Sequence, residues 1–257
     1  VAGRSRVAHL SEDETSSFQS SPTRSYAMDL STVAGCARLT DSIREDGAVF
    51  DLLFFTVGAW PNWTQPFSDD AVERVVALDL LARHVIFERL ASQGSLAPGA
   101  VVVNTMASTQ NMPLVSKAGV RVRLANNKAP HSLFSALAPL AVAADAWLRA
   151  AAHYYPDYAY VGTFPGIVAT DLMVPTLPPW AVPVVRALTK PIAISETEAG
   201  LNHVAVATAP NARRRKVTYW NHLLEGRRAH LVAYDPALIA FVWDHLTNLT
   251  ANLSASS

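Results

Sequence analysis

Short apolar runs, separated by longer segments with helical periodicity, most constrain the fold of this chain. The runs are continuous rather than alternating, which is typical of strands covered on both faces. They occupy 26–30, 51–58, 99–106 and 158–164. Helical patterns are predicted between them over 32–46, 69–93 and 132–153. Strand–helix–strand repetition predicts an α/β fold with a doubly wound parallel sheet.

Helix signals dominate the last third of the sequence. Four prolines predict a loop with a short helix over 173–185. Ser195 and Glu198 have the spacing of a capping box, which predicts a helix that runs to about residue 207. Asp235 is a good cap residue and Pro236 suits the first helical position, so an amphipathic closing helix is predicted over 236–250.

Length and composition limit the classes of protein that the chain can represent. The 257 residues fit a single domain, 1–257, with a C-terminal helical extension over about 211–257. The formal net charge is zero, so neither nucleic acid nor a membrane is an expected partner. Cys36 is the only cysteine, which excludes a disulfide framework and suits a cytoplasmic protein. The eight histidines are dispersed, so no metal site is predicted.

A sharp turn follows the last predicted strand, in the stretch "YVGTFPGIVATDL". Pro165 and Gly166 interrupt the apolar run, and Thr170 adds a hydroxyl shortly afterwards. In an open parallel sheet, ligands bind beyond the carboxyl ends of the strands. Residues that follow the strands are therefore the candidates for a binding site.

Several of these segments, taken in order, resemble the short-chain dehydrogenases/reductases, which are nicotinamide-dependent oxidoreductases on a Rossmann-type fold. The similar segments are "VAGRS", "YAMDL", "DLLFFTVG", "ERVVALDLLARHVIFERL", "PGAVVVNTMAS" and "FPGIVATDL". The stretches "YYPDYAYVGTFPGIVATDL" and "ISETEAGLNHVAVAT" are most similar to a divergent branch of the family found in fungi. The resemblance covers residues 1 to about 210.

The resemblance implies residues that bind the adenine half of NADP(H). Arg4 takes the place of an arginine that pairs with the 2′-phosphate, because a guanidinium matches a phosphate with two hydrogen bonds. Asp29 corresponds to an aspartate that meets the adenine. Gly58 is the one residue kept from an Asn-Asn-Ala-Gly turn.

The nicotinamide end of the coenzyme is assigned to Pro165, Gly166 and Thr170 by the same resemblance. Pro165 and Gly166 let the backbone approach a flat ring closely, and the Thr170 hydroxyl anchors its amide. The family grips the pyrophosphate with a Gly-x-x-x-Gly-x-Gly turn, and no three of the eleven glycines have that spacing. The sequence therefore predicts a truncated domain that lacks the first strand, this turn and the first helix.

The expected catalytic residues are altered. The family's Tyr-x-x-x-Lys pair belongs within 131–140, where the sequence has neither residue. The catalytic serine corresponds most nearly to Ser108, after a slip of one residue. Asp79 stands where the family has a helix asparagine. Ser108 and Asp79 are therefore the candidate catalytic residues.

Two functions remain open at this point. One is an NADP(H)-preferring oxidoreductase that acts on a carbonyl or alcohol of a small metabolite, with degenerate catalytic residues. The other is a catalytically inactive fragment, or a binding or interaction module, that keeps the fold. By analogy with the family, homo-oligomers form through the helices 69–93 and 132–153. The insertion at about 109–130 is either a substrate lid or phosphate contact, or a solvated loop or hairpin.

Overall fold

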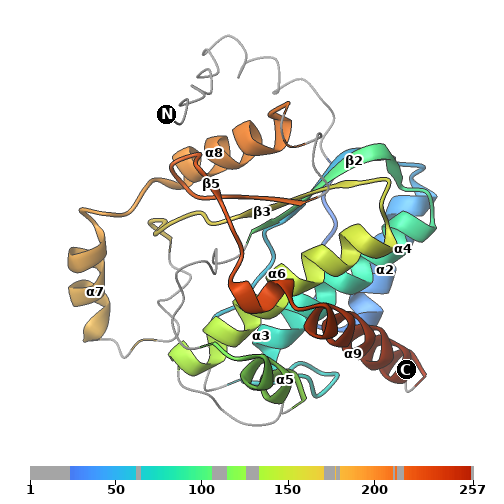
Figure 1. Cartoon of the computed structure of the whole chain (residues 1–257), viewed down its shortest axis with the longest axis horizontal. Coiled ribbons are helices and arrows are strands. Elements are labelled where there is room, and N and C mark those ends of the chain that lie inside the picture. The colour runs from blue at the N-terminus through green and yellow to red at the C-terminus, as the bar shows by residue number, and fades with distance from the viewer. Residues whose placement is uncertain are drawn as a thin grey trace.

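The chain forms one mainly parallel sheet with helices on both faces (Figure 1). The computed structural model describes residues 24–61, 65–105, 115–125, 133–170, 177, 180–210, 212 and 217–255. Its strands lie side by side in chain order: β1 (Phe50–Phe55), β2 (Leu96–Thr105), β3 (Ala159–Thr163), β4 (Val217–Trp220) and β5 (Gly226–Arg227). The first four are parallel, and β5 runs antiparallel to β4. The predicted α/β class with a parallel sheet is confirmed.

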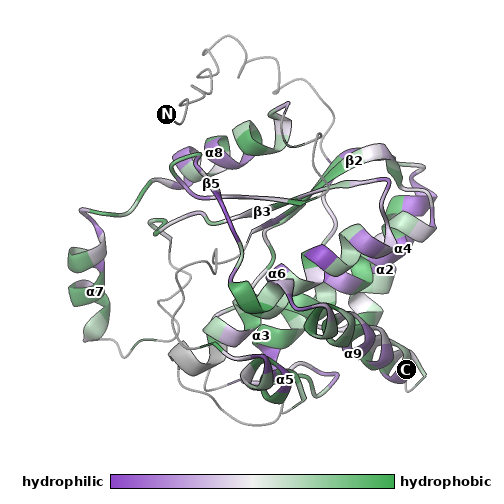
Figure 2. Ribbon diagram, in the orientation of Figure 1, coloured by the Kyte–Doolittle hydropathy of each residue, from purple (hydrophilic) through white to green (hydrophobic). Residues whose placement is uncertain are grey.

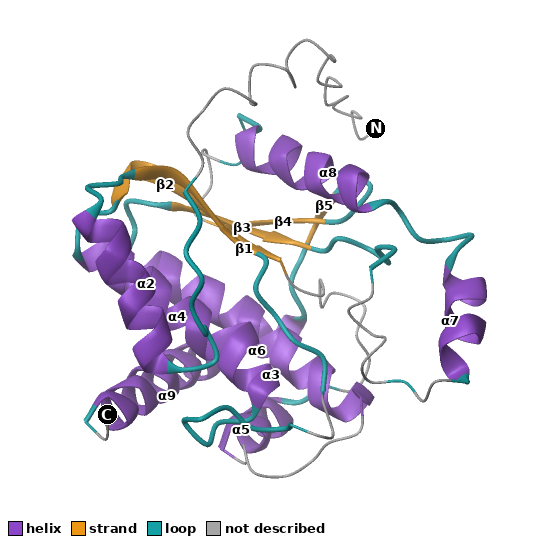
Figure 3. Ribbon diagram, turned by 180° about the vertical axis from the view of Figure 1, so that it is seen from behind, coloured by secondary structure: helices purple, strands orange, loops and turns teal. Residues whose placement is uncertain are grey.

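Both faces of the sheet are buried along β3 and most of β2, which explains why these strands have continuous apolar runs. Four helices cover one face and α8 covers the other (Figure 3). The four are α2 (Val33–Glu45), α4 (Ala82–Ser92), α6 (Leu133–Tyr154) and α9 (Pro236–Ser254), and α8 is Glu196–Thr208. Along β2, Val102 belongs to the large core under α6, whereas Val101 and Val103 pack on the α8 side. Alternate side chains thus enter two separate apolar layers.

The predicted strand 26–30 is wrong, because residues 24–29 have no strand hydrogen bonds. A strand needs a neighbour to accept and donate its backbone hydrogen bonds. In the part of the chain that the structure describes, β1 is an edge strand with no strand beyond it. The segment leads into α2, where the Asp29 carboxylate accepts hydrogen bonds from the backbone N–H and hydroxyl of Ser31, at 2.9 and 2.7 Å.

The predicted helix 69–93 consists of three pieces and begins later than expected. They are α3 (Arg74–Val76), a π-helical turn η2 (Ala77–Leu81) and α4. The acidic residues before it form a turn, and the Asp70 carboxylate accepts a hydrogen bond from the Val33 N–H at 2.7 Å. This carboxylate therefore binds a free backbone N–H at the N-terminus of α2, and not one at the start of the helix that follows it in the chain.

The last segment contributes strands as well as a helix, so the helical extension predicted over about 211–257 is wrong for residues 217–220 and 226–227. β4 and β5 extend the sheet, and a short 3₁₀ helix, η5 (Leu231–Tyr234), leads to α9. Asp235 caps α9 as predicted, because its carboxylate accepts a hydrogen bond from the Leu238 N–H at 3.0 Å. α9 packs against α4 and α6. It therefore takes up part of the surface on which the predicted oligomer contact was placed.

The insertion predicted as a loop or hairpin contains the helix α5 (Lys117–Ala125). α5 packs against α6 and α9. Lys117 forms an ion pair with Asp235 at 2.8 Å, and the Arg121 guanidinium lies 4.9 Å from the centre of the Phe241 ring. The insertion therefore joins the helical layer of the fold.

Arg123, the third basic residue of α5 after Lys117 and Arg121, is buried. Arg123 forms an ion pair with Glu73, and the two side chains are 2% and 8% exposed. A buried ion pair of this kind is strongly destabilising to break, because either partner alone leaves an uncompensated charge. Arg123 thus joins α5 to the residue that precedes α3, so it fits neither of the two interpretations of the insertion, a phosphate contact or a solvated loop.

A buried histidine joins three helices. His84 of α4 is fully buried, and its Nδ1 lies 3.3 Å from the Trp147 Nε1–H of α6. Since Trp147 can only donate, Nδ1 is the acceptor and Nε2 carries the hydrogen in the neutral ring. Nε2 lies 3.2 Å from the Glu88 carboxylate and 3.3 Å from the Thr247 hydroxyl of α9. His84 is therefore a buried polar residue whose two ring nitrogens both have partners.

No helix among the described residues combines the length and the apolar character that crossing a membrane requires. In the ribbon coloured by hydropathy, hydrophobic and hydrophilic residues share most helices (Figure 2). This amphipathic pattern is typical of helices that pack one face on a core.

Gly162→Ala is expected to destabilise the fold, because a Cβ at this position of β3 would lie 2.6 Å from the Tyr219 ring. Overpacking of this kind costs roughly 1–3 kcal/mol. Gly200→Ala in α8 is the matched control: a Cβ there meets no atom within 4 Å. It should stabilise the helix by up to about 1 kcal/mol. Urea unfolding measures both, and equal effects of the two variants would contradict this packing.

Candidate functional site

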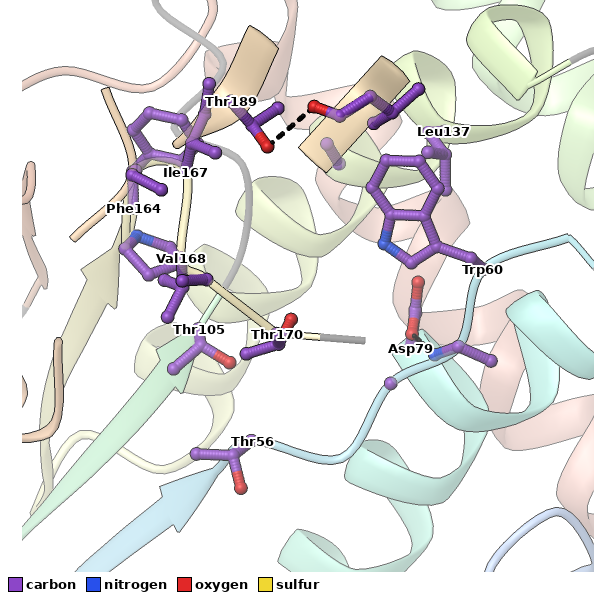
Figure 4. Close-up of a pocket in the computed structure, with 18 of the residues that line it drawn as sticks. Thr56, Trp60, Asp79, Thr105, Leu137, Phe164, Ile167, Val168, Thr170 and Thr189 are labelled. Atoms are coloured by element: carbon purple, nitrogen blue, oxygen red, sulfur yellow. Dashed lines mark hydrogen bonds between the residues drawn. The ribbon is translucent and has the colours of Figure 1, made fainter. Parts of the chain in front are cut away.

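A cavity of about 790 Å³ opens at the carboxyl ends of three parallel strands (Figure 4). Thr56 and the segment 58–60 follow β1, Thr105 ends β2, and the segment 164–170 follows β3. All of these residues line the cavity. Since parallel strands end at one edge of a sheet, three loops far apart in sequence converge here. The cavity has the size typical of small-molecule sites.

One buried arginine braces the floor of the cavity. Arg83 of α4 is 5% exposed, and its guanidinium donates hydrogen bonds to the backbone carbonyls of Val57 and Thr105 and to the Asn104 side chain. The Nε–Val57 and Nη1–Thr105 distances are 3.1 and 2.7 Å. Burial lowers the pKa of Arg83, and the neighbouring Asp79 carboxylate opposes that shift. The arginine ties the loop after β1 to the end of β2.

Asp79 is the only carboxylate among the described residues that line the cavity. It lies in the π-helical turn η2, and its Oδ1 accepts a hydrogen bond from the Ala59 N–H at 2.9 Å. Burial raises the pKa of its carboxyl group to about 6, although Arg83 and the Ala59 N–H act to lower it. Asp79 therefore titrates near neutral pH inside a mainly apolar cavity.

The two glycines predicted at the site each face a side chain of the protein itself. A Cβ on Gly58 would lie 2.7 Å from Asp79 Oδ1. Gly166 has a φ of +76°, and its Cβ would lie 2.8 Å from Cγ of His222. The flat ring that the Gly166 backbone approaches in this structure is therefore the His222 imidazole.

Apolar helices close the remaining sides. Leu137, Leu140 and two alanines of α6 form one wall, and α7 (Ala181–Thr189) faces it with Val182 and Val185. Arg186 and Lys190 also line the cavity on the α7 side. A cavity with apolar walls and polar groups gathered at the strand ends suits a small apolar molecule with one polar group.

The structure brings together most of the residues that the sequence singled out. The described cavity is lined by Gly58, Asp79, Pro165, Gly166 and Thr170. Asp29 is not among the described residues that line the cavity. It lies before α2, where its carboxylate accepts hydrogen bonds from Ser31. Arg4 and Ser108 lie outside the described residues.

The sequence interpretation missed Arg83 entirely. One signal was available: Arg83 follows Asp79 by four residues within a predicted helix, where opposite charges are neighbours. The acceptors of Arg83 were not readable, because they are carbonyls at the ends of two separate strands.

Comparisons with known proteins identify the fold. No family model matches the sequence. No curated protein matches it either. A 3-alpha-hydroxysteroid dehydrogenase from a Pseudomonas species, solved with NADH, superposes with a TM-score of 0.56 at 18% identity, covering 76% of this chain and 81% of the other.

Two further solved structures agree. A short-chain dehydrogenase/reductase from Serratia marcescens has a TM-score of 0.52 at 14% identity, with 83% of each chain covered. An NADPH-bound carbonyl reductase from chicken fatty liver has a TM-score of 0.51 at 13% identity, covering 78% of this chain and 75% of its own. This chain has the short-chain dehydrogenase fold. The Rossmann-type prediction is thus confirmed, and these likenesses concern the fold alone.

Asp79→Asn is expected to remove a pH dependence of stability. Because folding raises the pKa of Asp79 from 3.8 to about 6, the stabilisation by its proton is complete below pH 3.8 and is lost as the pH rises through 6. Relative to the natural protein, the asparagine variant should gain up to about 3 kcal/mol in unfolding free energy between pH 4 and pH 7. Urea unfolding across this range measures the difference.

Asp244→Asn on the exposed side of α9 is the control for the loss of one negative charge. A constant difference between the Asp79 variant and the natural protein at every pH would contradict the perturbed carboxyl group.

Proposed function

We propose that this protein is a divergent short-chain dehydrogenase/reductase that uses NADP(H) to reduce a carbonyl or oxidise an alcohol on a small apolar metabolite. The observation that carries the proposal is the cavity at the strand ends, where Gly58, Asp79 and the segment 165–170 meet. The fold shared with a hydroxysteroid dehydrogenase and a carbonyl reductase supports it. The similarity to the branch found in fungi remains part of the proposal.

The place of the cavity at the strand ends and its volume of about 790 Å³ support binding of the nicotinamide end of the coenzyme there. Pro165, Gly166 and Thr170 would hold that end, as the resemblance implies, because they line the cavity directly after β3. The adenine end is assigned to Arg4 and Asp29 on the resemblance alone. The sequence has no Gly-x-x-x-Gly-x-Gly, so no residue is assigned to the pyrophosphate. When bound, the coenzyme supplies or accepts a hydride.

The walls of the cavity select for an apolar substrate. α6 and α7 contribute leucine, valine and alanine side chains, and burying a ligand's apolar surface against them is favourable by about 25 cal/mol per Å². The polar end of the substrate would lie toward Asp79 and the strand ends, where the ionisable groups and hydroxyls are. The substrate class is therefore an apolar ketone, aldehyde or alcohol.

A second function, a binding module that keeps the fold, is favoured by one observation. No tyrosine lines the cavity in the described part of the chain, and the sequence lacks the Tyr-x-x-x-Lys pair where the family has it. A protein of this kind would hold an apolar ligand without a coenzyme. The two functions differ in whether NADPH binds and whether it is consumed.

Titration with NADPH tests the first function. Because Trp60 lines the cavity, energy transfer from its indole to a bound dihydronicotinamide should give a saturable signal. Thr170→Ala should weaken binding about 2- to 10-fold, the effect of one lost hydrogen bond. Thr208→Ala, an exposed threonine of α8 bonded within its helix, is the control and should bind as the natural protein does. The absence of a saturable signal would defeat the oxidoreductase.

Binding of an apolar dye such as Nile red tests the cavity itself. Ala141 of α6 lines the cavity, so Ala141→Phe should fill it and weaken dye binding at least about tenfold, since a buried aromatic ring takes up the volume of a ligand. Ala251→Phe on the exposed side of α9 is the matched control. Equal dye binding by both variants would place the apolar site elsewhere. Dye binding without NADPH binding would favour the binding module.

A further inference from the structure

A carboxyl group lines the cavity in which the proposed oxidoreductase would need a proton donor. Reduction of a carbonyl requires a proton for its oxygen, and the described lining has no tyrosine or histidine to provide one. Asp79 is the only carboxyl group there, and Figure 4 shows it among the labelled side chains that line the cavity. Lys190, which also lines the cavity, is an exposed residue directly after α7, so Asp79 is the candidate at the strand ends for the chemistry left open by the missing Tyr-x-x-x-Lys pair.

We propose that Asp79 is the proton-transfer residue of this cavity and that Arg83 is the residue that positions it. The inference rests on the proposed oxidoreductase function. In reduction, a hydride from the reduced nicotinamide adds to the carbonyl carbon, the C=O π bond breaks, and the Asp79 proton passes to the oxygen. The products are an alcohol, the Asp79 carboxylate and the oxidised nicotinamide. In alcohol oxidation the same carboxylate takes up the hydroxyl proton.

The backbone holds Asp79 in place for this role. η2 is a π-helical turn between two α-helices, and such turns are frequent at functional sites. Oδ1 is fixed by the Ala59 N–H, which leaves Oδ2 to face a substrate. Gly58 is needed beside it, because any side chain there would displace Oδ1. The carboxyl group is therefore oriented before a ligand arrives.

The charges around Asp79 set its acidity near the working pH. Arg83 lies one turn further along the same helix and lowers the pKa of the carboxyl group. The buried pair Glu73 and Arg123 acts in opposite directions, so the two effects offset each other. Across the cavity, α7 presents Arg186 and Lys190. Burial outweighs the attraction of Arg83 and gives a pKa of about 6, suitable for a group that both donates and accepts protons.

Arg83 acts through Asp79 and the strand ends. Its guanidinium is committed to the Val57 and Thr105 carbonyls and the Asn104 side chain, so it fixes the loop that carries Ala59, the hydrogen-bond donor to Asp79. Lysine keeps the charge but cannot reach all of these acceptors at once. Methionine removes the charge as well. Comparison of the two substitutions therefore separates the effect of Arg83 on the position of Asp79 from the effect of its charge.

The experiment uses the full chain and compares Asp79→Asn, Arg83→Lys, Arg83→Met and the surface control Asp244→Asn. Reduction of a panel of aromatic and alicyclic ketones by NADPH is followed from pH 5 to 9, and NADPH binding is measured separately by fluorescence. With the natural protein, kcat/KM for reduction should fall tenfold per pH unit above about pH 6, as the proton donor ionises. Asp79→Asn should lose 10²- to 10⁴-fold in kcat and lose this pH limb, while its Kd for NADPH changes less than twofold.

The titration of Asp79, followed by carboxyl-carbon NMR without coenzyme, provides a readout independent of activity. Arg83→Met should raise the pKa of Asp79. Arg83→Lys should change this pKa less, and it should lower kcat because the loop that positions Asp79 is no longer fixed. An unchanged pH limb in Asp79→Asn, or an Asp79 that titrates at the ordinary value of an aspartate, overturns the proposal. Failure of the natural protein to bind NADPH defeats the proposed function, and the NMR titration still decides on its own whether Asp79 has the required acidity.

Discussion

The Arg83 guanidinium, buried where β1 and β2 end, is the interaction on which the cavity depends. Parallel strands leave backbone carbonyls without ladder partners at the edge where the chain turns away, and buried carbonyls need donors. Arg83 supplies them to Val57 and Thr105 and binds the Asn104 side chain as well. A cation at this depth needs a nearby anion, and Asp79 provides it from the preceding turn of the same helix. The buried guanidinium of Arg83 therefore accounts both for the geometry of the loop after β1 and for the titratable carboxyl group of Asp79 beside it.

Buried polar groups join the helices of this protein at defined points, within a largely apolar core. His84 connects α4 with α6 and α9, and the ion pair of Glu73 with Arg123 fixes α5 to the start of α3. Such groups are costly to bury unless they are satisfied, so each favours one packing of the helices over others. The helical layer is therefore held firmly behind the cavity, whereas α7 lines it with both apolar and polar side chains and has no buried residue.

The sequence correctly predicted the elements that depend on uniform burial or on contacts with residues nearby in the chain. Runs such as 99–106 and 158–164 became strands because both of their faces are buried, and Asp235 capped α9 because a capping bond is made within four residues. Predictions that depended on a distant partner were less successful. Residues 26–30 have the composition of a strand without a neighbouring strand in the described structure, and β4 is too short for its pattern to stand out.

For the candidate site, the sequence by itself determined which residues follow each strand, and hence that Gly58, Pro165, Gly166 and Thr170 would lie at one edge of a parallel sheet. Local periodicity and turn chemistry are sufficient for that. Only the tertiary structure decided what each residue faces there: Gly166 meets the His222 ring, Asp29 turns back to Ser31, and Asp79 faces the cavity beside Arg83. The four-residue spacing of Asp79 and Arg83 indicates that their charges are neighbours. Their burial and the resulting acidity arise from contacts between segments far apart in the chain, and no local pattern encodes them.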